Sequence, residues 1–403
     1  MRANSLGVLG IGYGFLILSL SLAVSAVAAK PDKPAKAEKA AKTEKAAKTV
    51  EDTVSEKPAK ADSTSAERDE LKVGGVLEAG FDIHNKLDKN RTEYNKIGYG
   101  KIEISARPVK KVRAEFGLEY KDRDSTMSID KLYAQYNFAD WGGVRVGYMK
   151  KSFGLEERSG VEDRYFHKRS IINDGMAFRV NDEIDTDLLE HDLTFQYRHK
   201  IGESLRLVGG FSWAMADSVN SGRRWALFYK NYAQNYSVEY EDSTINLILA
   251  GIIGHYIGHY ADTNYQSDNY DFIVWVSSLS FKYSARIFVS ETELTFGNKP
   301  SEGSSYKDRA FFWGARLQEY FPLETGLKTL RQVIPVAEAA LYSEDIDDKS
   351  KDFDAQLRAG VTLGFAKNSA FQWRNTYGTV LRMLDGKNEL KRRRFDSEVV
   401  VVF

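Results

Sequence analysis

The end of the chain, from Arg394 to Phe403, combines two kinds of side chain with a period of two. A strand turns successive side chains to opposite faces. One face would carry Phe395, Val399, Val401 and Phe403, and the other Arg394, Asp396 and Glu398. The same division recurs from Lys72 onward, and no soluble core could hold so many ionised groups without partners. The pattern therefore predicts an all-β protein, a transmembrane antiparallel β-barrel with lipid outside and water inside.

The alternation divides into about 16 segments, an even number that puts both chain ends on the periplasmic side. The predicted strands cover residues 72–83, 94–107, 110–121, 126–139, 142–150, 188–200, 203–215, 224–240, 244–256, 270–283, 286–296, 309–321, 331–343, 353–366, 370–384 and 392–403. Long and short connections alternate between them. Outer-membrane barrels have this asymmetry, with short periplasmic turns and longer external loops.

Two segments of different composition precede the barrel. Residues 1–29 hold an apolar stretch that ends in Ala26-Val27-Ala28, which is typical of a secretory signal peptide. Residues 30–70 are rich in Lys, Ala and Glu and cannot bury a core, so we interpret them as a periplasmic tether. The barrel is then expected over residues 71–403.

The sequence offers little support for catalytic chemistry. The chain has no cysteine, which excludes disulfides, thiolate metal sites and cysteine nucleophiles. His255 and His259 lie four residues apart, but they fall in a predicted strand without a third ligand, so surface histidines are the favoured interpretation. No nucleotide-binding loop or serine nucleophile motif is found. We expect no enzyme activity, no metal, no cofactor and no nucleic-acid partner.

The third external connection, from Lys151 to Asp187, is the longest predicted connection in the barrel. Unstructured loops of this length in a compact fold are usually functional. A loop this long can fold back into the lumen of a barrel, and we expect that it does.

The residues around the start of this loop resemble the phosphate-selective porin O and P family. In that family a strand ending in Gly-x-x-Lys leads into a Pro/Ser-Phe-Gly-Leu-Glu stretch and then an aromatic-x-x-Arg-Ser motif. The corresponding residues here are Gly147, Lys150, Phe153, Gly154, Leu155, Glu156, Phe166, Arg169 and Ser170. The resemblance implies a sixteen-stranded channel in the outer membrane of a Gram-negative-type bacterium, a homotrimer with the third loop narrowing each pore. It also implies that the outer-membrane assembly machinery reads Phe403 as an assembly signal.

Basic residues are the candidates for ion selectivity, because rings of basic side chains select anions in a pore. At the constriction the candidates are Lys150, Lys151, Arg158, Arg164, Lys168 and Arg169. On the lumen wall, period two gives Arg113, Lys131, Arg145, Arg198, Arg206, Arg316, Arg358 and Arg374. Acidic residues accompany them in nearly equal number, so for most wall residues we favour a cross-strand salt-bridge lattice over a ligand ladder. The loop cluster is the best candidate for selectivity.

The predicted function is passive diffusion of small hydrophilic solutes with a mild preference for anions such as phosphate. One alternative is a channel strongly selective for phosphate or other oxyanions. Another is a non-conducting accessory barrel that sheaths a partner protein, because its lipid-contacting face would look the same.

Overall fold

The computed structural model describes residues 70–86, 91–122, 126–181, 184–187, 189, 191–213, 232–261, 267–300, 309–346, 353–365, 370–384 and 387–403. The predicted signal peptide and most of the tether lie outside these residues. Within them, no helix has both the length and the apolar character needed to cross a membrane.

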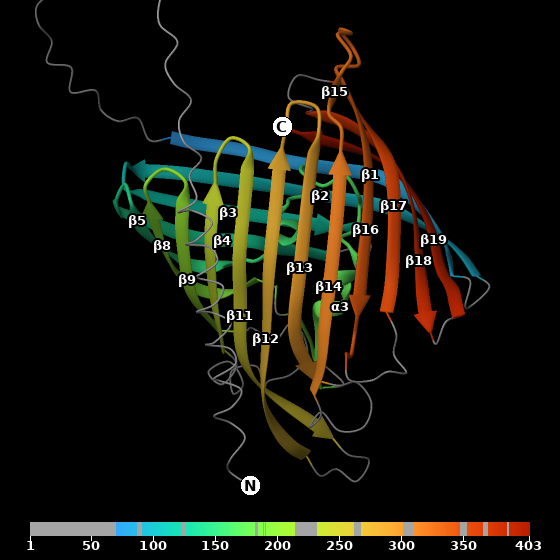
Figure 1. Cartoon of the computed structure of the whole chain (residues 1–403). Helices are drawn as coiled ribbons and strands as arrows, with labels where there is room; N and C mark the ends of the chain where they lie inside the picture. Colours follow the sequence, from blue (N-terminus) through green and yellow to red (C-terminus); the bar gives the residue numbers. More distant parts are fainter. Residues whose placement is uncertain are drawn as a thin grey trace, which may run out of the picture. The chain divides into compact units, whose positions relative to one another are not determined.

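The described strands form one sheet of 17 members that closes on itself, with β1 paired to β19 (Figure 1). One member, β15 (Leu323–Glu324), is a two-residue strand paired with β16, so sixteen strands build the wall. They are β1 (Glu70–Lys86), β2 (Arg91–Val109), β3 (Val112–Lys121), β4 (Thr126–Ala139), β5 (Gly142–Lys150), β8 (His191–Ile201), β9 (Leu205–Trp213), β10 (Tyr232–Glu241), β11 (Ile245–Ala261), β12 (Ser267–Ser284), β13 (Val289–Pro300), β14 (Arg309–Tyr320), β16 (Gln332–Ser343), β17 (Phe353–Gly364), β18 (Phe371–Leu384) and β19 (Lys387–Val402). The predicted barrel and its strand number are confirmed.

The two faces of the wall differ as the alternation predicts. On β8, Phe195 is 45% exposed and Tyr197 is 39% exposed. The alternate residues Thr194 and Gln196 are 0% and 3% exposed. The exposed aromatic face suits lipid, and the polar face, which we call the inner face, suits a wet lumen. Aromatic rows mark the ends of the outer face. His255 lies in one of them, its ring stacked 5.2 Å from that of Tyr232, while the side chain of His259 lies outside the described part.

One stretch of wall departs from the rule. In β11 the inner face is apolar as well, because Ile248, Ala250 and Ile252 are almost fully buried there. They form a core with Phe153 and Ile172 from the connection between β5 and β8. An apolar inner face must be shielded from the water in the lumen. On β11 the connection between β5 and β8 covers it.

Phe403 is placed at the closure of the barrel. Its N–H donates to the Gly75 carbonyl at 3.0 Å and its carbonyl accepts from the Gly75 N–H at 2.9 Å. A Cβ at position 75 would lie 2.5 Å from the Phe403 ring, so the ring requires glycine beneath it.

Deleting Phe403 should lower the amount of folded, heat-modifiable protein in the membrane, because the β1–β19 closure loses two hydrogen bonds and a ring contact. The two hydrogen bonds alone correspond to about 1–3 kcal/mol. Conductance per assembled channel should not change. Phe403→Tyr, which keeps the ring and the backbone, is the matched control and should fold normally. Normal levels of the deletion variant would refute an assembly role.

Candidate functional site

The connection between β5 and β8, residues 151–190, is called loop 3 below. Its described part contains α2 (Leu155–Arg158), α3 (Ile171–Met176) and the small hairpin of β6 (Ala177–Asn181) and β7 (Ile184–Asp187). Its hydrogen bonds and ion pairs reach inner-face side chains on β1, β8, β10, β12, β13, β14, β17, β18 and β19. Loop 3 is thus fastened along one continuous arc of the wall.

Glu156 holds loop 3 in shape. Its buried carboxylate accepts hydrogen bonds from the Ser170 N–H and hydroxyl, both at 2.6 Å, and from the Asn173 amide at 3.0 Å. It also lies 3.8 Å from Arg316 on β14 and 3.9 Å from Arg358 on β17. Burial alone would raise the pKa of Glu156, but the two guanidinium groups and the Ser170 hydrogen bonds hold it below its usual value. One carboxylate therefore joins the two ends of loop 3 and fixes them to the wall.

The motif residues that carry the family resemblance are the ones that dock the loop. Phe153 is 0% exposed. A Cβ on Gly154 would lie 2.1 Å from a Glu293 carboxylate oxygen, so glycine permits the close approach to β13. The ring of Phe166 lies 4.3 Å from the Arg358 guanidinium carbon. The motif is therefore a set of attachment points.

Most of the predicted constriction residues are tied to carboxylates. Lys150 and Arg169 both pair with Glu157, at 2.9 and 2.6 Å. Lys151 is buried and pairs with Asp192 on β8. Arg158 pairs with Glu239 on β10 at 2.9 Å. A carboxylate of loop 3 or of the wall therefore lies against each of these four cations.

Among the predicted loop residues, Arg164 differs from this pattern. Arg164 has no ion pair among the described residues, and its buried Nε has no hydrogen-bond partner there. Burial and the nearby Arg169 lower its pKa. Lys168 contributes its backbone carbonyl, which accepts a hydrogen bond from Arg358.

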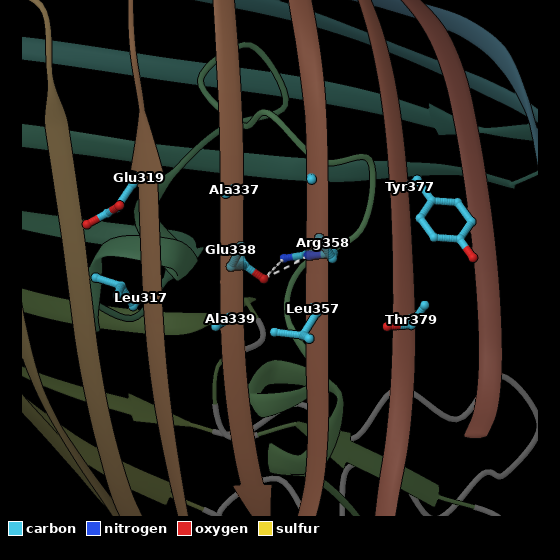
Figure 2. Close-up of a pocket in the computed structure, with 10 residues that line it drawn as sticks. Leu317, Glu319, Ala337, Glu338, Ala339, Leu357, Arg358, Tyr377 and Thr379 are labelled. Atoms are coloured by element: carbon cyan, nitrogen blue, oxygen red, sulfur yellow. Dashed lines mark hydrogen bonds and ion pairs between the residues drawn. The ribbon is translucent and has the colours of Figure 1, made fainter. Parts of the chain in front are cut away.

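On β14 to β19, the predicted wall arginines form a lattice. Arg316 pairs with Glu338 at 2.9 Å, and Arg358 pairs with the same carboxylate from the next strand (Figure 2). Arg374, 3.4 Å from Glu398, donates to the Val161 carbonyl of loop 3 at 2.9 Å. Each of these three arginines is paired with a carboxylate, as expected for a salt-bridge lattice. Arg358 and Arg374 also donate hydrogen bonds to backbone carbonyls of loop 3.

The opposite arc of the wall carries a second group of arginines, which we call the arginine wall: Arg113 on β3, Arg145 on β5, Arg198 on β8 and Arg206 on β9. Cross-strand register places Arg113 and Arg145 on either side of Gln135, and Arg198 opposite Gly143, two residues along β5 from Arg145. Of the loop 3 ion pairs described above, the one between Lys151 and Asp192 reaches β8, and none of them involves an arginine of the arginine wall. Arg206 shares Glu239 with Arg158 of loop 3, so the arginine wall begins beside the docked segment and continues away from it through β8 and β5 to β3.

Charge compensation on the arginine wall is incomplete. Arg113 pairs with Glu115 at 2.5 Å and Arg206 with Glu239 at 3.2 Å. Arg145 instead donates to the Gln135 side-chain oxygen Oε1 at 2.6 Å and lies over the Tyr133 ring. Among the described residues, neither Arg145 nor Arg198 has an ion-pair partner. Lys131, on β4 beside them, pairs with Glu103 and Glu115 and continues the lattice.

Within the described residues, one group has ligand atoms close enough for a metal ion: Glu78, His167 and Glu398, all within 4.8 Å of one another. The imidazole Nδ1 already lies 2.8 Å from Glu78 and 3.2 Å from Glu398, and Arg374 lies beside Glu398. We assign the group as an ion-paired network, because nearby positive charge already compensates both carboxylates.

A family model described as phosphate-selective porin O and P matches residues 50–209, a range that contains every motif residue quoted above. The match confirms the resemblance inferred from those residues. None of the curated proteins matches the chain.

Several solved structures share the fold. An anion-selective porin from Comamonas acidovorans matches with a TM-score of 0.56 at 11% identity, over 83% of this chain and 100% of that one. OprB of Pseudomonas putida gives 0.57 at 8%, over 83% and 94%. A trimer form of OmpT, an outer-membrane protein of Vibrio cholerae, gives 0.51 at 11%, over 83% and 99%. These similarities confirm the closed antiparallel barrel.

Proposed function

We propose that this chain is an outer-membrane porin through which small hydrophilic solutes diffuse passively, with a preference for anions set by the arginine wall. The porin family match and the closed barrel support a location in the outer membrane of a Gram-negative-type bacterium. They favour a channel over an enzyme. The trimer form of one structural neighbour supports a homotrimer surrounded by lipid.

One observation carries the anion preference: Arg145 and Arg198, which have no ion-pair partner among the described residues, lie on β5 and β8, outside the arc from β10 to β19 and β1 where most loop 3 contacts are made. Loop 3 occupies the arc from β10 to β19 and β1, and it narrows the lumen towards the opposite side. Solutes then pass beside Arg145 and Arg198. In a narrow passage with low-dielectric walls, two unpaired guanidinium groups raise the local concentration of anions far more than they would in open water.

Strong phosphate selectivity is the second candidate, and one feature of loop 3 favours it. Arg164 and Arg169 interact electrostatically with each other, and each buries an Nε without a hydrogen-bond partner among the described residues. Two guanidinium groups with free donors suit a tetrahedral oxyanion. The accessory barrel of the sequence analysis has no such observation in its favour.

Phosphate added to the purified protein in planar bilayers separates these candidates. The proposed porin should carry chloride current and lose less than half of it at about 1 mM phosphate, a concentration that corresponds to weak binding of about −4 kcal/mol. Liposomes containing the protein should swell in small neutral sugars. Half-block at about 1 μM phosphate would establish the second candidate instead, and a protein that inserts without conducting would refute both.

A further inference from the structure

His167, in loop 3, lies between two carboxylates from the first and the last strand of the barrel. Its Nδ1 is 2.8 Å from Glu78 on β1 and 3.2 Å from Glu398 on β19. The side chains of Glu78 and Glu398 are 2% and 1% exposed, so water screens these contacts poorly. Residue 80 of β1 pairs directly with Glu398, which makes the two carboxylates diagonal neighbours across the closure of the barrel.

The other charged groups around His167 come from three elements. Arg374 on β18 approaches Glu398 at 3.4 Å. Arg164, on the loop itself, interacts electrostatically with Glu78. Asp396 lies two residues before Glu398 on the same face of β19 and is held by Arg394 at 2.5 Å. A positive charge on His167 thus meets more negative than positive charge at contact distance.

The same contacts hold a continuous piece of loop 3. Before His167, Val161 packs on Val76 and Val400, and its carbonyl accepts from Arg374. After it, the carbonyls of Lys168 and Arg169 accept from Arg358 on β17. Val161 spans the closure of the barrel by apolar packing, and His167 spans it with a titratable side chain.

We propose that protonated His167 is a positioning residue that clasps residues 161–169 of loop 3 to the β1–β19 closure and so sets the width of the passage past the arginine wall. The inference rests on the proposed porin function for its effect on solute flow, and on the contacts alone for the position of the loop.

The charge state of His167 gives the clasp a pH dependence with a defined sign. Burial would lower the pKa of His167, but hydrogen bonds and electrostatic attraction from Glu398 and Glu78 raise it to about 9. A free histidine titrates near 6.5. The clasp is therefore fully formed below about pH 6.5 and weakens as the pH rises through about 9.

Spin labels can follow the loop directly, because the chain contains no cysteine. Asp163→Cys places one label on the clasped segment and Lys200→Cys places the other on β8, both at exposed positions. The inter-label distance in the reconstituted protein should be narrowly distributed at pH 7 and should broaden with a midpoint near pH 9. His167→Gln should be broad at pH 7 already. His167→Lys, whose ordinary pKa is about 10.4, should keep the narrow distribution past pH 9.

His199→Gln is the control for a general histidine effect, since His199 contacts Trp141 on the outer face, and its midpoint should equal that of the parent. Equal distance distributions for the parent, His167→Gln and His167→Lys at every pH would overturn the clasp. Single-channel conductance is recorded on the same samples and should rise with the loss of the narrow distribution. A shift in distance in a protein without conductance would leave the clasp standing and remove the porin function instead.

Discussion

Glu156→Ala should release loop 3 from the wall and raise the single-channel conductance. The carboxylate accepts three hydrogen bonds within the loop and faces Arg316 and Arg358. Removing one partner from a buried charged network costs about 3–5 kcal/mol. Each 1.4 kcal/mol is a factor of ten, so the equilibrium between docked and released loop should shift at least about 100-fold. The barrel wall itself should remain folded, because its strand pairing does not involve Glu156.

Two further variants identify the cause. Ser170→Ala removes only the hydroxyl that donates to Glu156 and should cost about 1 kcal/mol, with a small rise in conductance. Glu324→Ala changes an exposed carboxylate on β15, outside the network, and should behave as the parent protein. Parental conductance for Glu156→Ala, in protein that is folded and heat-modifiable, would show that loop 3 does not narrow the passage.

Reversing the charge of Arg145 and Arg198 together should change the ion preference from anions to cations. Neither side chain has an ion-pair partner among the described residues, so each reversal replaces a positive charge outside any ion pair with a negative one. The local potential of a narrow low-dielectric passage follows this change directly. The measurement is the permeability ratio of chloride to potassium in the Arg145→Glu, Arg198→Glu double variant, and each single variant should lie between the double variant and the parent.

The matched control changes net charge by the same amount elsewhere. Lys328→Glu with Arg393→Glu alters two exposed residues, one in the β14–β16 turn and one on β19. This pair should leave the permeability ratio near that of the parent. An equal effect from both pairs would mean that total charge, and not the arginine wall, governs selectivity.

The strands and their faces could be predicted because period two is a local property of the sequence. On β8, for example, the exposed and buried faces separate Phe195 and Tyr197 from Thr194 and Gln196. This separation can be predicted without knowing which strands lie beside β8. The apolar inner face of β11 also has a local signal, the run from Leu247 to Gly254, which is apolar on both faces and therefore indicates cover on both.

The selectivity residues could not be ranked from sequence, because pairing depends on the path of the loop. Arg158 meets Glu239, 81 residues away, and the loop carbonyl that Arg358 binds lies 190 residues from it. The numbers of acidic and basic residues are nearly equal, but the charges are unevenly distributed. Ion pairs are concentrated where loop 3 contacts the wall, whereas Arg145 and Arg198, which have no ion-pair partner among the described residues, lie on β5 and β8. The loop cluster therefore looked like the stronger candidate, and the structure favours the arginine wall as the hypothesis to test.

The reversal potential of the purified parent protein, recorded across a planar bilayer between concentrated and dilute potassium chloride, tests the proposed anion preference most directly. Arg145 and Arg198, which lack ion-pair partners among the described residues, should give a reversal potential whose sign shows that chloride permeates faster than potassium. The opposite sign, or a value of zero in a protein that conducts, would contradict the assignment of the arginine wall as the selectivity surface.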